Sequence, residues 1–164
     1  MVKDKNGNWE YDSTLDVSSD LKSLEPVVLG EGEFRYQVSG LDWGDLPDGW
    51  SYKEATAVAV DSRDRVYVFN RGTHPMIIFD STGKVLDSWG GGIFSNPHSV
   101  TIGLDDSIYC VDSGDSSVRK FDMAGNLLTT IGTPHKPSPK MSGVPFNRPA
   151  HLAVDKQTSD LYIA

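Results

Sequence analysis

Short apolar runs alternate with turn residues along most of the chain. In the first stretch the runs cover residues 56–61, 65–69, 76–80 and 85–90, and glycine or aspartate stands between them. The runs are rich in Val, Ile, Tyr and Phe and are too short for stable helices, so the pattern predicts β-strands. No segment after Trp50 has an apolar period of 3.6 residues, and we therefore expect helices there to be absent or one turn long.

The pattern of four runs is repeated. A second copy covers residues 98–103, 107–111, 118–122 and 127–132, and a third begins at 150–155 and reaches 161–163. The first two copies are 42 residues apart at four landmarks: Val58 and Val100, Tyr67 and Tyr109, Phe79 and Phe121, Gly83 and Gly125. A period of this length with four strands is typical of a β-propeller blade. The sequence therefore predicts an all-β protein, and Gly83 and Gly125 are expected in hairpin turns with positive φ.

The copies do not complete a ring. Even four blades of this length need about 170 residues, whereas the third copy stops at Ala164. We interpret the sequence as the N-terminal part of a longer protein, an arc of about two and a half blades truncated in the third. A half-ring that closes by dimerisation is the alternative.

Two segments lie outside the regular repeats. Residues 1–30 are polar, and we predict a mobile segment with a short helix over Ser18–Leu24. The propeller arc is predicted over 31–164, with a strand over Phe34–Val38. An insertion with five prolines, residues 133–149, separates the second and third copies, so Tyr109 and Tyr162 are 53 residues apart. Insertions of this kind often border a binding site.

Charge and composition narrow the classes of partner. The chain has 15 Lys and Arg against 23 Asp and Glu, a net charge of −8, which argues against nucleic acid or an anionic membrane as partner. The single cysteine, Cys110, lies in an apolar run and is expected to be buried. No apolar run approaches the length of about 20 residues that spans a bilayer, and Met1–Glu10 lacks the apolar core of a signal peptide. We predict a cytoplasmic location.

Several motifs resemble known proteins. Residues 58–61 (VAVD) and 85–90 (VLDSWG) are similar to NHL repeats, which build propellers. One enzyme family has similar motifs in the same order and register. The motifs in this chain are FNRGTH at 69–74, NPHSV at 96–100, and NRP at 147–149, which leads to LYIA at 161–164. This family is the lyase domain of peptidylglycine α-amidating enzymes, the peptidyl-α-hydroxyglycine α-amidating lyase.

The resemblance implies a six-bladed propeller with zinc held by three histidines in the central channel. It implies that His98 is the first zinc ligand, that Arg71 is a catalytic residue, and that the backbone carbonyls of Val58 and Val100 bind a structural calcium. The enzymes split a hydroxyglycine hemiaminal into a peptide amide and glyoxylate, so the implied substrate is a peptide or small molecule. The catalytic tyrosine and the other two zinc histidines fall beyond Ala164, and the fragment alone is expected to be inactive.

The residues themselves leave other interpretations open. Without the resemblance, His98 is a loop histidine, and Arg71 at a strand end forms a surface ion pair with an aspartate. His74 is expected to be a capped loop histidine, while His135 and His151 match no ligand position. Three aspartates are interpreted as turn or strand-end residues, because no calcium-loop spacing is present: Asp112, Asp115 and Asp122.

Two other functions compete with the lyase. The first is a non-catalytic NHL propeller that binds a protein or ligand on one face, since one fold hosts many functions. The second is a gluconolactonase-like hydrolase, which would need a cluster of Glu, Asn and Asp around the channel that the sequence does not show.

Overall fold

The structure is a computed structural model that describes residues 2–3, 9–10, 28–37, 43–144 and 146–164, with side chains from Val28 onward. The described residues are all β-strand, turn and loop, as predicted. The chain divides into two compact units, Met1–Trp43 and Gly44–Ala164. No helix among the described residues is long and apolar enough to cross a membrane.

The first unit contains two short antiparallel hairpins. In one, β1 (Val2–Lys3) pairs with β2 (Trp9–Glu10), and in the other β3 (Val28–Leu29) pairs with β4 (Tyr36–Gln37). The strand predicted over Phe34–Val38 is therefore limited to β4 within the described residues. The helix predicted over Ser18–Leu24, and most of the segment predicted to be mobile, lie outside the described residues.

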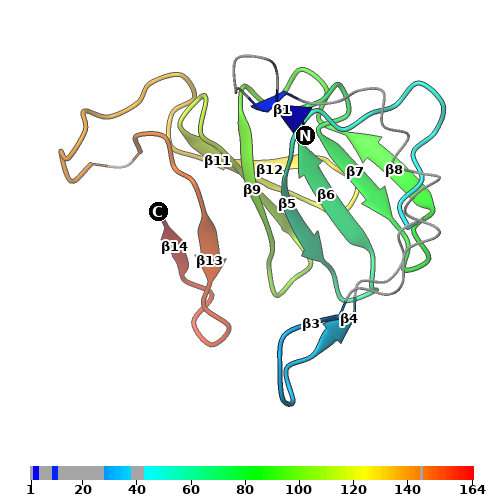
Figure 1. The fold of residues 1–164 in the computed structure, drawn as a ribbon. Coiled ribbons are helices and arrows are strands. Elements are labelled where there is room, and N and C mark those ends of the chain that lie inside the picture. The colour runs from blue at the N-terminus through cyan, green and yellow to red at the C-terminus, as the bar shows by residue number, and fades with distance from the viewer. Residues whose placement is uncertain (1, 4–8, 11–27, 38–42, 145) are drawn as a thin grey trace. The chain divides into compact units, whose positions relative to one another are not determined.

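The second unit holds the repeats as successive antiparallel sheets (Figure 1). The first sheet consists of β5 (Ala55–Val60), β6 (Val66–Asn70), β7 (Met76–Phe79) and β8 (Val85–Trp89). The second consists of β9 (Pro97–Ile102), β10 (Ile108–Asp112), β11 (Ser117–Phe121) and β12 (Leu127–Ile131). The third repeat contributes β13 (Leu152–Val154) and β14 (Leu161–Ile163). Each four-stranded sheet pairs its strands in chain order, which is the connectivity of a propeller blade.

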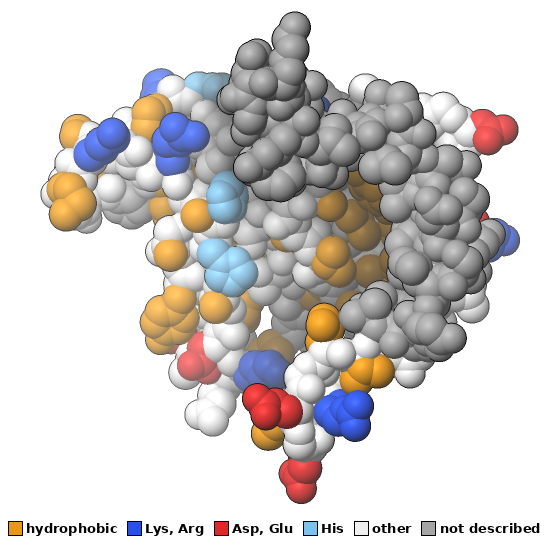
Figure 2. Space-filling view, in the orientation of Figure 1, with side chains coloured by type: hydrophobic (Ala, Val, Ile, Leu, Met, Phe, Trp, Pro, Cys, Tyr) orange, Lys and Arg blue, Asp and Glu red, His pale blue; other side chains and the backbone are white. Residues whose placement is uncertain are grey.

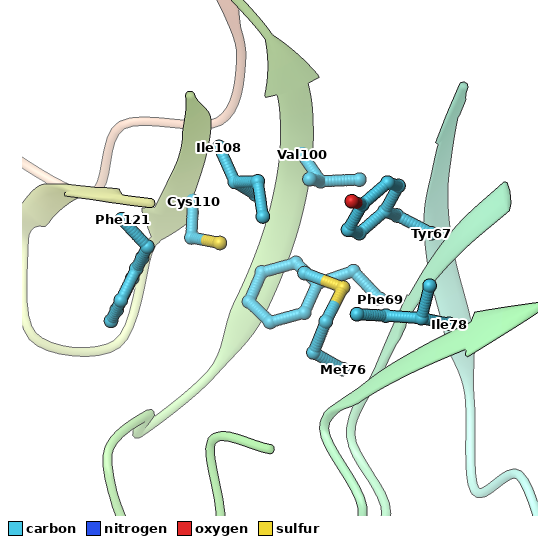
Figure 3. Close-up of a cluster of buried hydrophobic side chains, with 8 residues drawn as sticks. All are labelled: Tyr67, Phe69, Met76, Ile78, Val100, Ile108, Cys110 and Phe121. Carbon is cyan, nitrogen blue, oxygen red and sulfur yellow. The ribbon is translucent and has the colours of Figure 1, made fainter. Parts of the chain in front are cut away.

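The sheets are held together by side chains from both faces of the second sheet. Because side chains alternate along a strand, Ile108 and Cys110 of β10 face the first sheet, whereas Tyr109 and Val111 face the third repeat. Figure 3 shows the first of these cores, which has eight buried members: Tyr67, Phe69, Met76, Ile78, Val100, Ile108, Cys110 and Phe121. The second core joins Tyr109, Val111 and Val118 to Leu152 of β13. Stacking of blade on blade thus explains why every residue of β10 is buried.

Cys110 is fully buried in the first core, as predicted. Burial raises the pKa of its thiol above the ordinary value, because a thiolate would lose its hydration among apolar neighbours. The residue is therefore a small core side chain and not a reactive thiolate.

The two predicted hairpin turns have the same construction. Gly83 and Gly125 have φ angles of 91° and 79°, which confirms the expectation of positive φ. In each turn the glycine N–H donates to the backbone carbonyl of an aspartate, Asp80 or Asp122, at 3.0 Å. The same aspartate accepts two further backbone N–H groups with its side chain.

We expect Gly125→Ala to destabilise the protein more than Gly92→Ala. Both glycines have positive φ, but a Cβ at Gly125 would lie 2.9 Å from Cγ of Trp89, whereas one at Gly92 would meet nothing within 4 Å. The backbone cost is about 1–2 kcal/mol at either site, and the clash raises the loss at Gly125 to about 3 kcal/mol. Urea unfolding of the two variants measures the difference, and equal losses would show that Trp89 moves aside freely.

Candidate functional site

A groove of about 340 Å³ runs across the first strands of the three repeats. Its lining residues come from β5, β9 and the segment before β13: Thr56, Ala57, Val58, His98, Ser99, Val100, Ala150 and His151. In the space-filling view, histidine side chains gather on the face that carries β9 and β13 (Figure 2). The groove therefore brings together three residues singled out from the sequence, His98, Val58 and Val100.

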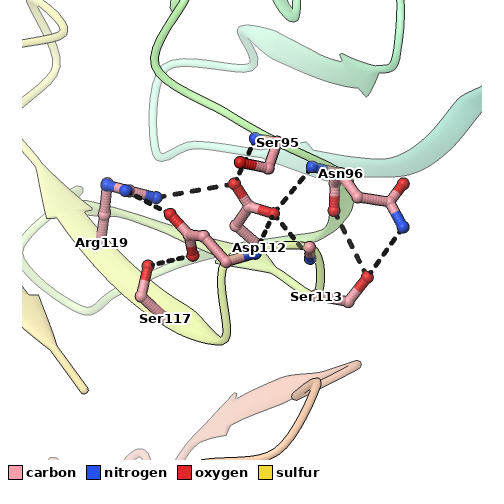
Figure 4. A network of polar contacts seen from close by, with 8 residues as sticks. Ser95, Asn96, Asp112, Ser113, Ser117 and Arg119 are labelled. Carbon is pink, nitrogen blue, oxygen red and sulfur yellow. Dashed lines mark hydrogen bonds and ion pairs between the residues drawn. The ribbon is translucent and has the colours of Figure 1, made fainter. Parts of the chain in front are cut away.

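His98 is the second residue of β9 and is partly buried. The chain that leads into it is held by Asp112 at the end of β10, whose carboxylate accepts the backbone N–H groups of Ser95 at 2.6 Å and Asn96 at 2.8 Å. The amide of Asn96 also donates to the hydroxyl of Ser113 at 3.1 Å. Figure 4 shows this network, which fixes the loop immediately before Pro97 and His98.

The same carboxylate belongs to a buried ion cluster. Arg119 lies 3.7 Å from Asp112 through Nη1 and donates through Nη2 to Asp115 at 2.5 Å. Both aspartate side chains are fully buried, and that of Arg119 is only 9% exposed. Ser117 completes the cluster by donating to Asp115 at 2.6 Å. The prediction that Asp112 and Asp115 stand at a strand end and a turn is confirmed, but their pairing with Arg119 was not foreseen.

Arg71 follows β6 and reaches the same part of the molecule from the first sheet. Its Nε donates to the backbone carbonyl of Pro97 at 3.1 Å, and its Nη1 contacts the carboxylate of Glu54 at 2.5 Å. Arg71 therefore contacts the residue before His98, although it lines a different hollow. That hollow is about 570 Å³ and is lined by residues 51–53 and 71–73. The ion pair expected for Arg71 exists, with a glutamate in place of an aspartate.

Comparison with known proteins identifies the type of repeat. No protein-family model matches the chain. The chain is 31% identical over 116 residues to NHL repeat-containing protein 3 of Mus musculus and 30% identical over the same length to that of Homo sapiens. Its repeats are of the NHL type. Each match covers 65% of this chain, and the chain spans about a third of the length of these relatives, 33% in both cases.

In this arc of an NHL propeller, β5, β9 and β13 are neighbours, and β9 contacts both of the others. The side chain of Val58 is exposed and that of Val100 is buried, while both residues line the groove. Their carbonyls as calcium ligands remain a prediction. Among the described residues, no three His, Cys, Asp or Glu side chains are grouped so that they could hold a metal ion.

The remaining histidines of the NHL arc have separate environments. His74 stacks on Trp50 with ring centroids 3.7 Å apart, and its Nδ1 lies 3.2 Å from the hydroxyl of Thr73. His135 is exposed in the proline-rich insertion. His151 lines the groove with His98, a role that sequence reasoning missed. The available signal was its position at the start of the third repeat, directly before β13.

Proposed function

We propose that this NHL arc forms part of a zinc-dependent lyase that cleaves peptidyl-α-hydroxyglycine to a peptide amide and glyoxylate. The observation that carries the proposal is the hydrogen bond from Arg71 to the carbonyl of Pro97, because it ties the candidate catalytic arginine to the strand that presents His98. Arg71 and His98 belong to two of the motifs that suggested the enzyme and are 27 residues apart in the sequence. The hydrogen bond from Arg71 to Pro97 joins these two motifs in the fold.

The residues of the groove fit part of a zinc site. His98 and His151 are two imidazoles on one groove, and imidazole nitrogen is a common zinc ligand. A zinc ion bound to neutral imidazoles would supply positive charge and an open position that lower the pKa of a bound hydroxyl. The resemblance places the other two histidines of its three-histidine site beyond Ala164, and the described residues bring no third metal ligand to the groove.

Arg71 is suited to hold the substrate. In the reaction the hydroxyl proton leaves, its oxygen becomes the aldehyde of glyoxylate, the C–N bond breaks, and the amide nitrogen takes up a proton. The substrate carries a carboxylate throughout, which a guanidinium can bind through two parallel hydrogen bonds. The present partner, Glu54, is 54% exposed, so the ion pair is solvated and weak and a substrate carboxylate can compete with it.

The proposed calcium has a structural role. The carbonyls of Val58 and Val100 belong to the first strands of adjacent blades, and both residues line the groove. A cation shared by these strands would hold the blades at a fixed separation beside His98.

We expect His98→Ala to remove most of the bound zinc from the purified protein. Loss of one imidazole removes a direct ligand, whereas the matched control His135→Asn removes an exposed imidazole outside the groove. Asparagine suits the control because residue 135 has a φ of 62°. Elemental analysis of both variants, made without a polyhistidine tag, gives the zinc content. Zinc retained at full stoichiometry in His98→Ala would remove His98 from the site.

Release of glyoxylate from a hydroxyglycine peptide by the full-length protein, which would supply the residues implied beyond Ala164, tests the reaction itself. Arg71→Ala is expected to abolish this release, and Arg71→Lys to retain only a part of it, because a lysine keeps the charge and loses the planar fork. Full-length wild-type protein that binds zinc but releases no glyoxylate would instead indicate an NHL module that binds without catalysis.

A further inference from the structure

His151 faces the same groove as His98 from the neighbouring repeat. The start of the third repeat is held against β9 by two side chains of that strand. Ser99 contacts Nδ1 of His151 at 3.0 Å, and Thr101 donates to the backbone carbonyl of Leu152 at 2.8 Å. The groove therefore receives one histidine from β9, His98, and one from the segment before β13, His151. The contacts of Ser99 and Thr101 join these two sides of the groove.

The contact with Ser99 determines which nitrogen of His151 is available. Because Nδ1 is occupied by the hydroxyl, Nε2 is the nitrogen left for a ligand. Ser99 is buried, whereas His151 is exposed. The edge of the imidazole ring that carries Nδ1 is therefore held by the protein, and the edge that carries Nε2 is accessible to a ligand. A hydrogen bond to the second ring nitrogen is the usual device by which proteins orient a metal-binding histidine.

The lining of the groove selects the class of ligand. None of the described residues that line it is acidic, and the groups beside the two histidines are aliphatic side chains and hydroxyls. Hard cations such as Mg²⁺ prefer carboxylate oxygens, whereas imidazole suits Zn²⁺, Cu²⁺ and Ni²⁺. The chemistry of the lining thus favours a borderline transition metal.

We infer that His151 is a metal ligand that acts together with His98, through Nε2, with Ser99 as its positioning residue. The inference rests on the proposed function in one respect, since it shares His98 with the proposed zinc site. It assigns one of the three histidine positions to the third repeat, whereas the resemblance places both remaining histidines beyond Ala164, so the zinc keeps its open position. It also makes the junction between the second and third repeats part of the metal site.

Metal titration of the stripped, untagged protein tests the inference. We expect His151→Ala and His98→Ala each to weaken Zn²⁺ binding, measured by calorimetry, by at least about tenfold. His135→Asn should bind Zn²⁺ as the wild type does. With Cu²⁺ as the probe, pulsed electron paramagnetic resonance should detect two imidazoles in the wild type and one in His151→Ala. Unchanged Zn²⁺ affinity or an unchanged Cu²⁺ spectrum in His151→Ala would overturn the inference.

Ser99→Ala keeps both imidazoles and removes only the positioning contact. We expect it to weaken Zn²⁺ binding by about tenfold, as loss of a hydrogen bond to a ligating histidine usually does, and to leave two imidazoles in the Cu²⁺ spectrum. Zinc lost in His98→Ala but kept in His151→Ala would refute this inference and leave the proposed lyase standing. Zinc lost in both variants, with no glyoxylate from the full-length wild type, would establish the metal site and refute the lyase.

Discussion

Replacing Asp112 by alanine is expected to lower the free energy of unfolding by about 3–5 kcal/mol, because the change leaves buried partners unsatisfied. The carboxylate accepts the backbone N–H groups of Ser95, Asn96 and Gly114 at 2.6–2.9 Å. It also lies 3.7 Å from the buried guanidinium of Arg119. Alanine can replace none of these contacts, and the carboxylate that makes them is fully buried. Urea unfolding followed by tryptophan fluorescence measures the loss.

The matched control is Asp105→Ala, in the turn that joins β9 to β10. Asp105 also pairs with a cation, Lys120, at 3.0 Å, and accepts the hydroxyl of Ser107. Ser107 and then Lys120 lower the pKa of Asp105 to about 2. The side chain is nevertheless 63% exposed, so its removal should cost no more than about 1 kcal/mol. Equal losses for the two variants would show that the Asp112 network is not a stability determinant.

The Asp112 variant also tests how the fold positions the site. Its two loop contacts, Ser95 and Asn96, directly precede Pro97 and His98. If this network fixes the start of β9, the variant should bind Zn²⁺ more weakly than the wild type at a temperature where both are folded. Zn²⁺ affinity that is unchanged in a folded Asp112→Ala protein would separate the network from the groove.

The repeat architecture was predictable from the sequence because its signals are local. Alternation of apolar residues, turn glycines and the 42-residue interval are each visible within one or two blades. The structure places Gly83 and Gly125 in equivalent turns, and Tyr67 and Tyr109 on equivalent strands. The buried ion cluster was not predictable in the same way, because Asp112 meets loop residues 16–17 positions earlier. Pattern rules assign such an aspartate to a turn, and they do not foresee a buried Arg119.

The candidate site was foreseen in part for the same reason. Val58 and Val100 occupy equivalent repeat positions, so a propeller necessarily brings their strands together. His98 lies on the same strand as Val100 and is therefore placed in the same groove. The bond from Arg71 to Pro97 joins two blades, and no local pattern encodes it. His151 was missed because the insertion over residues 133–149 disturbs the interval, and because its partnership with Ser99 spans 52 residues.

Phe121→Ala is expected to cost about 3–5 kcal/mol, since it opens a cavity in the core shared by two blades. The ring is fully buried and contacts Trp89 at 4.8 Å and Phe94 at 5.9 Å between centroids, both of which precede the second sheet in the chain. The loss therefore acts on the interface between the sheets and not on one sheet alone. Because the blades share this core, urea unfolding should remain one transition that shifts to lower urea.

Leu128→Ala is the control for a large apolar residue of the same sheet outside the core. Leu128 lies on β12 and is 55% exposed, so its truncation should change stability by no more than about 0.5 kcal/mol. Phe121→Leu should fall between the two, because a leucine refills most of the volume that alanine leaves empty. Two separate transitions in Phe121→Ala, with the second at the wild-type midpoint, would contradict a shared core. In that case each blade would have to be stable through contacts within its own sheet. A single four-stranded sheet with both faces apolar does not have enough such contacts to be stable alone.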